Sequence, residues 1–405
     1  MYEYQQHSIY FAQAPGMMEA LCEQELLELG ATRTTIAYRG VSFHADPATL
    51  YKINYASRLI SRVLAPLKTF RCPDAASLMK ATKSIQWESF FSVDQTFAIT
   101  ATIAKSNFTN SLYAAQCMKD GIADYFRSVT KGRRPSVSTV NPDVRLNLRI
   151  EGNDAVMSLD TSGESLHKRG YRLLAGEAPM QETLAAAIIR ITGWDGENPL
   201  WDPMCGSGTL LCEALMHYCR IPAQVLRKNF GVFHMPDFDE HAWKAMKKAL
   251  DEQIRPLPEG LISGSDSSRE VLRVARNNLS RLPGSDAVTL ACRSFQNAEP
   301  FENGTLVTNP PYGIRLGEIE QVKKLYNELG DFIKQRCKGT KSFIYTGDPS
   351  LRKSIGLKTS KRIPLVNGKL EGVLVQIDSY EGSKKKYYAE YKAEETGKSP
   401  DPQPD

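Results

Sequence analysis

The chain has 405 residues, 41% of them hydrophobic and 24% charged, with a formal net charge of +5, which is the composition of a globular protein of two to three domains. Its eight cysteines form no C-x-x-C pair and its six histidines show no ligand spacing, so we expect neither a metal site nor a disulfide framework. No apolar run reaches the roughly 18 residues of a membrane span and the N-terminus lacks a signal-peptide pattern, so we expect a cytoplasmic protein.

The first 160 residues mix strand and helix signals without regular alternation, which predicts an α+β fold. The predicted strands are residues 8–12, 34–44, 97–104, 144–150 and 155–160, and the predicted helices are 16–29, 47–64 and 111–129. From residue 50 to 149 the chain has fifteen Lys or Arg and six Asp or Glu, a net of +9. Such a segment often faces a polyanion, although a solvated basic surface explains it equally well.

After HKRGYR (His167 to Arg172) strands and helices alternate, which predicts a parallel sheet covered on both faces. The predicted strands are 199–201, 261–264, 287–291, 304–308 and 342–345, the helices are 208–220, 268–281 and 318–335, and roughly 221–260 is a helical insertion. Residues 362–366 and 372–378 flank Asn367-Gly368 and predict an antiparallel hairpin that closes the sheet. From residue 381 the chain is polar, which predicts a disordered tail.

A candidate cofactor site lies in WDPMCGSGT (Trp201 to Thr209), where a strand ends, a glycine-bearing turn follows and a helix begins. Glycine lets the backbone approach a ligand, and the helix N-terminus offers unpaired N–H groups. The turn lacks the full G-x-G-x-x-G of a pyrophosphate site, and Asp202 at the strand end suits a cationic ligand. Asp266 ends the next predicted strand and can accept hydrogen bonds from two ribose hydroxyls, although each Asp alone is explained equally well as a helix N-cap.

A candidate catalytic motif, Asn309-Pro310-Pro311-Tyr312, follows the strand at 304–308. Two prolines stop helix and sheet and fix the direction of the backbone carbonyls. Methyl transfer from a sulfonium to an exocyclic amine of a nucleobase needs acceptors for the amine protons, because the nitrogen lone pair is delocalised into the ring. The Asn309 side-chain oxygen and the Pro310 carbonyl are two such acceptors, and Tyr312 can stack on the base. A rigid turn after a strand is the alternative interpretation.

On these motifs the chain resembles the class I, S-adenosylmethionine-dependent methyltransferases of the UPF0020 family, which carry an N-terminal THUMP domain. The resemblance spans roughly residues 5–380. It is greatest to the N-terminal half of the fused bacterial enzyme that makes N2-methylguanine in large-subunit ribosomal RNA. The segments that carry it are HKRGYR, APMQETLAAAII (Ala178 to Ile189), DPMCGSGT and NPPYG.

The resemblance implies a Rossmann-like α/β methyltransferase domain at 166–380, preceded by a ferredoxin-like segment at 1–45 and a THUMP RNA-binding domain at 46–165 and followed by the tail at 381–405. It implies S-adenosylmethionine as the cofactor and RNA, above all large-subunit ribosomal RNA, as the partner. The implied catalytic residues are Asn309, Pro310, Pro311 and Tyr312, and the implied cofactor-binding residues are Asp202, Pro203, Cys205, Gly206, Ser207, Gly208, Thr209, Asp266, Glu182 and Thr183. The basic residues that we expect to hold phosphates are Lys83, Lys105, Lys131, Arg133, Arg134 and Arg145.

The chain departs from the family at two points. Members often carry an Asp near the cofactor adenine, where this chain has Ser294, whose hydroxyl can still form a hydrogen bond with adenine. The fused enzyme carries a further methyltransferase domain, so we do not expect a second ribosomal modification from this chain.

The NPPY motif alone does not select the substrate. It also occurs in enzymes that methylate adenine N6 in DNA or glutamine amides in protein, whereas the basic first half favours RNA. Guanine N2 in ribosomal RNA is the leading prediction. Guanine N2 in tRNA, adenine N6 in a nucleic acid and a non-enzymatic RNA-binding assembly factor stay open, as does the oligomeric state.

Overall fold

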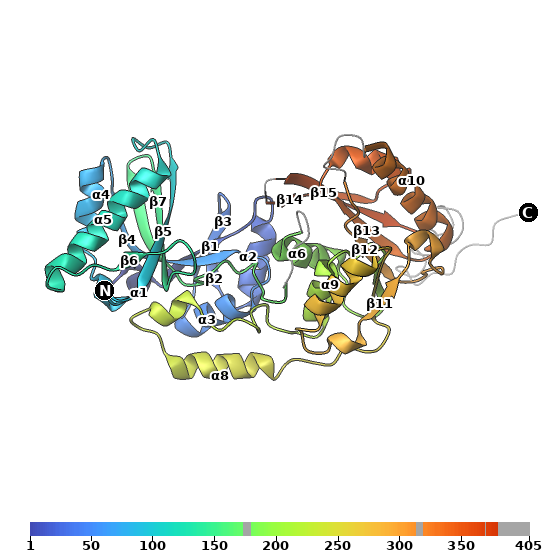
Figure 1. Cartoon of the computed structure of the whole chain (residues 1–405), viewed down its shortest axis with the longest axis horizontal. Helices are drawn as coiled ribbons and strands as arrows, with labels where there is room; N and C mark the ends of the chain where they lie inside the picture. The colour runs from blue at the N-terminus through green and yellow to red at the C-terminus, as the bar shows by residue number, and fades with distance from the viewer. Residues whose placement is uncertain (173–179, 313–318, 369, 380–405) are drawn as a thin grey trace, which may run out of the picture. The chain divides into compact units, whose positions relative to one another are not determined.

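The computed structural model describes residues 1–172, 180–312, 319–368 and 370–379, and the chain divides into two compact units (Figure 1). Unit 1 contains Met1–Arg172 and Ile221–Ile254, and unit 2 contains Leu173–Arg220 and Arg255–Asp405. The predicted tail, the first two residues of APMQETLAAAII and the last five of NPPYGIRLG lie outside the described residues.

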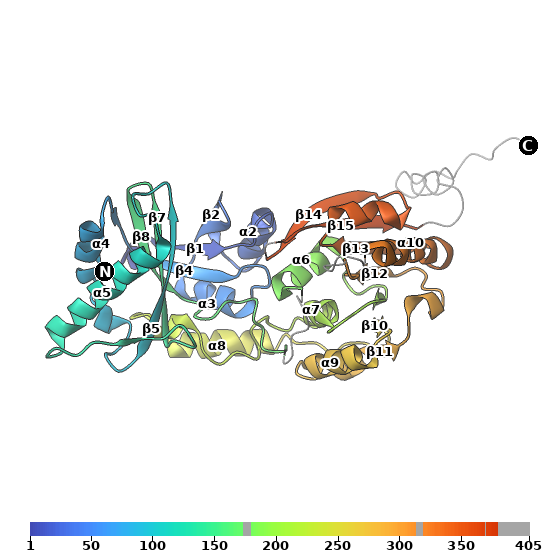
Figure 2. The ribbon, with the colours of Figure 1, turned by 45° about the horizontal axis from the view of Figure 1, so that its top comes forward.

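Unit 1 is built on an eight-stranded sheet with the strand order β2-β3-β1-β4-β8-β7-β5-β6 (Figure 2). The strands are β1 (Ile9–Gln13), β2 (Thr32–Ala37), β3 (Gly40–His44), β4 (Arg62–Arg71), β5 (Thr96–Ala104), β6 (Ser136–Val137), β7 (Val144–Glu151) and β8 (Asp154–Asp160). The helices are α1 (Glu3–His7), α2 (Glu19–Glu28), α3 (Pro47–Ala56), α4 (Ala75–Lys83), α5 (Ser111–Val129) and α8 (Glu240–Asp251). The α+β architecture agrees with the prediction, and α5 has the predicted bounds.

The single strand predicted at 34–44 is in fact a hairpin. β2 and β3 are antiparallel neighbours, with Ala37 opposite Gly40. The chain reverses at Tyr38-Arg39, where Arg39 adopts a left-handed φ of +54°. No Asn-Gly or Asp-Gly pair marks this turn in the sequence, so the sequence does not indicate a hairpin here.

The helix predicted at 47–64 ends at Ala56, and β4 follows it. The reason is tertiary: the buried Glu25 carboxylate accepts hydrogen bonds from the Ser57 hydroxyl at 2.5 Å and from the backbone N–H of Arg58 and Leu59 at 2.8 and 3.1 Å. These bonds pull the backbone out of the helix. Neither β4 nor α4 was predicted from the sequence.

The insertion after residue 220 belongs to unit 1. The Trp243 ring of α8 lies 5.9 Å from the Tyr51 ring and 6.0 Å from the Tyr55 ring, both on α3. The Arg227 guanidinium donates to the backbone carbonyls of Ser162, Glu164, Ser165 and Lys168 at 2.7 to 3.2 Å. Burial lowers the pKa of Arg227 to about 10. The insertion therefore fixes the segment that follows β8.

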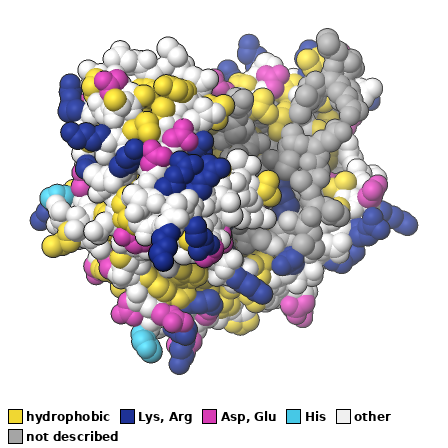
Figure 3. Space-filling model, turned by 60° about the vertical axis from the view of Figure 1, so that its left-hand side comes forward, with side chains coloured by type: hydrophobic (Ala, Val, Ile, Leu, Met, Phe, Trp, Pro, Cys, Tyr) yellow, Lys and Arg dark blue, Asp and Glu magenta, His cyan; other side chains and the backbone are white. Residues whose placement is uncertain are grey.

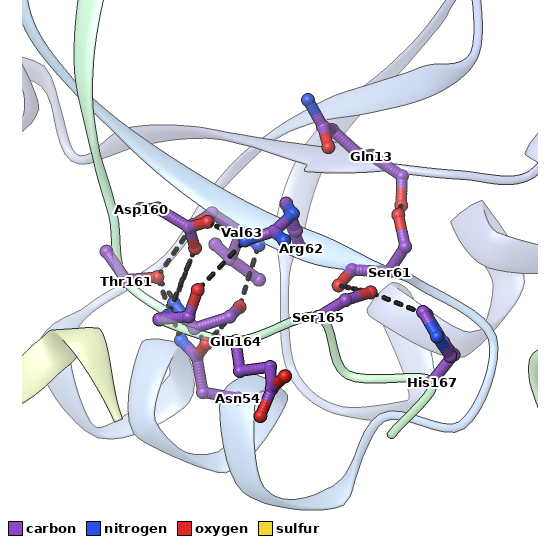
Figure 4. A network of polar contacts seen from close by, with 12 residues as sticks. Gln13, Asn54, Ser61, Arg62, Val63, Asp160, Thr161, Glu164, Ser165 and His167 are labelled. Atoms are coloured by element: carbon purple, nitrogen blue, oxygen red, sulfur yellow. Dashed lines mark hydrogen bonds and ion pairs between the residues drawn. The ribbon is translucent and has the colours of Figure 1, made fainter. Parts of the chain in front are cut away.

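A polar network also fixes the segment that follows β8 (Figure 4). The buried Asp160 carboxylate pairs with Arg62 and accepts the N–H of Ser162 at 3.0 Å. The Asn54 side chain bonds the Thr161 and Ser162 hydroxyls at 3.1 and 2.7 Å. Because these buried polar groups satisfy one another, the backbone after β8 has one defined course.

Unit 2 contains a seven-stranded sheet with the strand order β11-β10-β9-β12-β13-β15-β14. The strands are β9 (Leu200–Asp202), β10 (Ile262–Asp266), β11 (Thr289–Cys292), β12 (Thr305–Thr308), β13 (Lys341–Thr346), β14 (Lys361–Asn367) and β15 (Leu370–Asp378). The first five are parallel, and β15 and β14 are antiparallel. The predicted parallel sheet and closing hairpin are confirmed.

The helices of unit 2 are α6 (Glu182–Thr192), α7 (Thr209–Tyr218), α9 (Arg269–Leu279) and α10 (Ile319–Arg336), and they cover both faces of the sheet (Figures 1 and 2). On one face, a Cβ added to Gly264 of β10 would lie 2.4 Å from Leu211 of α7. On the other face, the Trp201 ring lies 5.8 Å from the Phe332 ring of α10. Both faces are thus buried, which explains the continuous apolar runs of these strands.

Candidate active site

The carboxyl ends of four neighbouring strands carry the predicted site. The sheet order β11-β10-β9-β12 sets Ser294, Asp266, Asp202 and Asn309 in that sequence along one edge. β9 has β10 on one side and β12 on the other, so the strand order reverses there. Open α/β sheets bind ligands at such a switch point. Residues more than one hundred positions apart in the chain therefore meet at one edge.

Asp202 is a buried carboxylate at the switch point, with 1% of its surface exposed. One of its oxygens accepts the backbone N–H of Met204 at 3.1 Å. Its pKa is raised to about 7, chiefly by burial and to a lesser extent by the nearby charge of Asp266, and hydrogen bonding opposes the shift. An ionised carboxylate in this position is stabilised by a cationic ligand.

Asp266 holds the glycine turn in place and is not the N-cap of α9. Its two oxygens accept the backbone N–H of Gly206 and of Ser268, at 3.1 and 3.0 Å. The N-cap is Ser268, whose hydroxyl accepts from Val271. A carboxylate has about four lone-pair positions, so Asp266 retains acceptors for further donors.

The two glycines of the turn serve different purposes. Gly206 has φ +55° and an added Cβ would meet nothing within 4 Å, so its missing side chain faces open space. Gly208 has φ +79°, and an added Cβ would lie 3.2 Å from the Cβ of Ala275 on α9. Gly206 therefore leaves room beside Asp202 and Asp266, and Gly208 permits close packing of two helices.

The other predicted residues of the turn take part mainly through packing and backbone hydrogen bonds. The Cys205 thiol packs against β10, where an added Cβ on Gly264 would lie 3.3 Å from its sulfur, and burial raises the pKa of this thiol. The Cys205 N–H donates to Ser265 at 2.9 Å, and the Ser265 hydroxyl donates to the Pro203 carbonyl at 3.3 Å. The hydroxyl oxygens of Ser207 and Thr209 lie 3.5 Å apart at the start of α7.

The NPPY motif follows β12 directly. The Asn309 side-chain oxygen is buried and has no hydrogen-bond partner among the described residues. A buried acceptor without a donor is costly, so this atom fits a donor supplied by a ligand. The Tyr312 ring is half-buried and lies against Gly347 after β13, where an added Cβ would be 2.9 Å from its Cε2 atom. Pro310 is buried and Pro311 is exposed.

The remaining predicted cofactor residues lie at the margins of this edge. Ser294 follows β11 and is partly exposed, and its hydroxyl bonds Gln296. Glu182 and Thr183 form the first turn of α6, and both are buried. The backbone N–H of the preceding residue donates to the Asn367 side chain of β14 at 3.1 Å.

The predicted phosphate-binding residues lie in unit 1 and differ in how their charge is used. Lys83 pairs with Asp124 at 2.8 Å, and Arg133 pairs with Asp94. The remaining four have no acidic pairing partner within the described ranges; they are Lys105, Lys131, Arg134 and Arg145. On the face shown in Figure 3, Lys and Arg side chains form separate groups, several of them beside Asp or Glu.

In the part of the chain that the structure describes, no helix combines the length and apolar character needed to cross a bilayer. No group of three or more His, Cys, Asp or Glu side chains in those same residues could hold a metal ion.

Three protein-family models match the chain. The model described as RMKL-like, methyltransferase domain matches residues 169–376, the THUMP domain matches 72–160 and the RlmL ferredoxin-like domain matches 10–64. The first covers unit 2 together with the insertion, and the other two lie in unit 1.

Similar sequences bear names of RNA methyltransferases. A Synechocystis protein named "Putative RNA methyltransferase" is 38% identical over 92% of this chain and 97% of its own length. The "Ribosomal RNA large subunit methyltransferase K/L" proteins of Syntrophotalea carbinolica and Vibrio campbellii are each 36% identical, over 91% and 89% of this chain. The chain spans about half the length of these two relatives, namely 53% and 52%.

Solved structures of similar fold include "a putative methyltransferase complexed with SAH", which is 28% identical with a TM-score of 0.81 over 93% of this chain and 99% of that one. Another is "a possible methylase from Clostridium difficile 630", 26% identical with a TM-score of 0.82 over 93% and 100%. The cofactor of this fold is S-adenosylmethionine.

The residues at the strand ends fit that cofactor. Asp202 can hold its ammonium, Asp266 retains acceptors for the ribose hydroxyls, and the open space at Gly206 admits the chain between them. The strands that carry these groups are adjacent, and neighbouring strands lie about 4.8 Å apart. One extended ligand can therefore contact both carboxylates.

Proposed function

The chain belongs to the family of RMKL-like methyltransferases, and from this premise we propose that it methylates the exocyclic N2 amine of a guanine in large-subunit (23S) ribosomal RNA. It is a methyltransferase, and S-adenosylmethionine supplies the electrophilic methyl group when it is bound. The finer assignment has three parts: the methyl group goes to an amine, the substrate is RNA, and the base is guanine.

The amine is supported by one observation above all, the buried and unpartnered Asn309 oxygen beside the switch point. An NH2 group offers two donors, of which Asn309 accepts one and the Pro310 carbonyl the other. These bonds orient the nitrogen lone pair toward the methyl group, so positioning supplies much of the rate. Tyr312, which lies against Gly347, offers its remaining ring surface to the base.

RNA as the substrate is supported by unit 1. The THUMP match spans residues 72–160 and so overlaps most of the segment 50–149, which has a net charge of +9. Four exposed or partly exposed cations of the matched residues, Lys105, Lys131, Arg134 and Arg145, form no ion pair among the described residues. Large-subunit ribosomal RNA as the substrate is supported by the names of the K/L relatives, whose matches extend over 91% and 89% of this chain. The choice of guanine N2 rests on the family resemblance of the sequence motifs. We propose a cytoplasmic location, where this substrate is found.

The test is methyl transfer to ribosomal RNA from cells that lack the protein, followed by digestion to nucleosides and mass spectrometry. We expect N2-methylguanosine to increase, and mapping then gives its position. N6-methyladenosine in its place would establish the alternative amine, and labelling of tRNA alone would establish the alternative RNA. No transfer to any RNA, with the cofactor bound, would support the assembly-factor alternative.

The Asn309→Ala variant tests the acceptor role in the same assay. We expect transfer to fall by about 100- to 1,000-fold, as when one preorganised hydrogen-bonding group is removed from an active site, and cofactor affinity to stay the same. The matched control is Asn277→Ala, an exposed asparagine of α9. Full activity of Asn309→Ala would show that this acceptor role is wrong.

A further inference from the structure

The tip of the β2–β3 hairpin in unit 1 presents an aromatic ring to solvent. Tyr38 is 84% exposed, the highest value for any tyrosine among the described residues. Its side chain makes no hydrogen bond or ring contact within the described ranges. A surface tyrosine of this kind contributes nothing to the core, so its ring is available to a partner with a flat, apolar face.

The strand that leads to this tip is an unpaired edge. β2 is the first strand of the eight-stranded sheet and pairs with β3 alone (Figure 2). Residues 32–39 (TRTTIAYR) contain two arginines, three threonines and one tyrosine, and no carboxylate. Six of these eight residues are exposed. The edge is therefore positively charged and rich in hydroxyl donors, which suits a polyanion.

Both arginines adopt a left-handed backbone conformation, which glycine or asparagine would adopt at a lower cost in free energy. Arg33 has φ +47° and Arg39 has φ +54°. In unit 1, the described non-glycine residues with positive φ also include Lys105 and Lys131, both exposed and both among the predicted phosphate contacts. Left-handed strain in non-glycine residues clusters at functional sites. Arg33 lies where the register of β2 shifts between Thr32 and Thr35, and Arg39 lies in the turn, so both charges stand at irregular points of this edge.

We propose that the outer edge of β2 and the hairpin tip bind a single-stranded segment of the RNA, with one unpaired base stacked on Tyr38 and flanking phosphates on Arg33 and Arg39. The five steps from Arg33 to Tyr38 extend at most about 17 Å at 3.3 Å per residue, and less where the register of β2 shifts near Arg33, which is enough for two or three nucleotides. α2, which packs on this hairpin, carries three exposed or partly exposed glutamates, Glu19, Glu23 and Glu28, so the RNA follows the edge and not the surface of that helix. This inference rests on the proposed RNA substrate.

The experiment measures binding of a fluorescein-labelled oligouridylate to the full chain by fluorescence anisotropy. Tyr38→Ala should weaken binding by about 5- to 150-fold, the loss of one base–aromatic stack, while Tyr38→Phe keeps the affinity and Tyr38→Leu does not. Arg39→Gly should weaken binding and reduce the slope of log affinity against log salt by about 0.7. The same variant should raise the melting temperature, because glycine relieves the left-handed strain. Arg39→Lys, which keeps the charge, should bind like the parent chain.

Two results would overturn the inference. One is parent-like affinity of both Tyr38→Ala and Arg39→Gly in a chain that still methylates RNA, which leaves the proposed function intact. The other is that the hairpin edge pairs with a second copy of the chain. In that case the parent chain would self-associate, and Tyr38→Ala would abolish the self-association without changing RNA affinity. By contrast, a parent chain that binds no RNA and transfers no methyl group to it refutes the proposed function itself.

Discussion

Cofactor affinity should depend on pH through Asp202. This carboxyl is buried and its pKa is raised to about 7. We propose that its charged form holds the cationic ammonium of the cofactor. With a pKa of 7, about 76% of the carboxyl is ionised at pH 7.5 and about 9% at pH 6.0. Because binding selects the ionised form, affinity for S-adenosylhomocysteine should fall about eightfold over this interval, which corresponds to about 1.2 kcal/mol.

Isothermal titration calorimetry measures this effect directly. At pH 6.0, binding should release close to one proton, seen when buffers of different ionisation enthalpy are compared. Adenosine lacks the methionine end, so its affinity should not change between the two pH values. Asp202→Asn should bind S-adenosylhomocysteine weakly and with no pH dependence. A flat affinity profile of the parent chain, or the same profile in Asp202→Asn, would refute the reasoning.

The stability of the ligand-free chain should move in the opposite direction. The pKa of Asp202 is raised from 3.8 in a model peptide, so its contribution to stability is fully present below 3.8 and is lost as pH rises through about 7. The melting temperature of the ligand-free parent should therefore fall, relative to Asp202→Asn, between pH 5 and pH 7.5. A parallel change in both chains would remove Asp202 as the cause.

Three further outcomes are expected. Gly206→Ala and Gly260→Ala both place a Cβ at positive φ in open space and should each cost about 1 kcal/mol of unfolding free energy, but Gly206→Ala alone should weaken cofactor binding in calorimetry. Arg227→Met removes four hydrogen bonds to backbone carbonyls and should lower the unfolding free energy of unit 1 by about 2 to 4 kcal/mol in urea, whereas the exposed neighbour Lys228→Met should change little. RNA affinity should fall steeply with salt, with a log–log slope of about −3 if four unpaired cations each contact a phosphate of a single strand; a salt-independent affinity would exclude phosphate binding by unit 1.

Most of the elements of unit 2 could be predicted because their signals are local. Buried parallel strands read as short apolar runs, and a glycine turn or a proline pair marks where each run ends. The prediction was weaker for unit 1, because the end of α3 depends on a residue distant in sequence. There the Glu25 carboxylate accepts hydrogen bonds from the backbone N–H groups after Ala56, and β4 follows. Tyr38 was missed for a related reason: it was interpreted as the middle of one long strand, whereas it lies at the tip of a hairpin.

The sequence by itself determined the candidate residues, since Asp202, Gly206, Asp266 and Asn309 each lie at or after the end of a recognisable strand. Only the tertiary structure decided that they are neighbours, because the order β10-β9-β12 depends on how strands pair across a sheet and not on their order in the chain. It also decided the charge state of Asp202, which depends on exclusion of water by residues distant in sequence, and it assigned the insertion to unit 1 through ring packing on α3. Local patterns specify chemical groups, whereas burial and adjacency are properties of the folded chain.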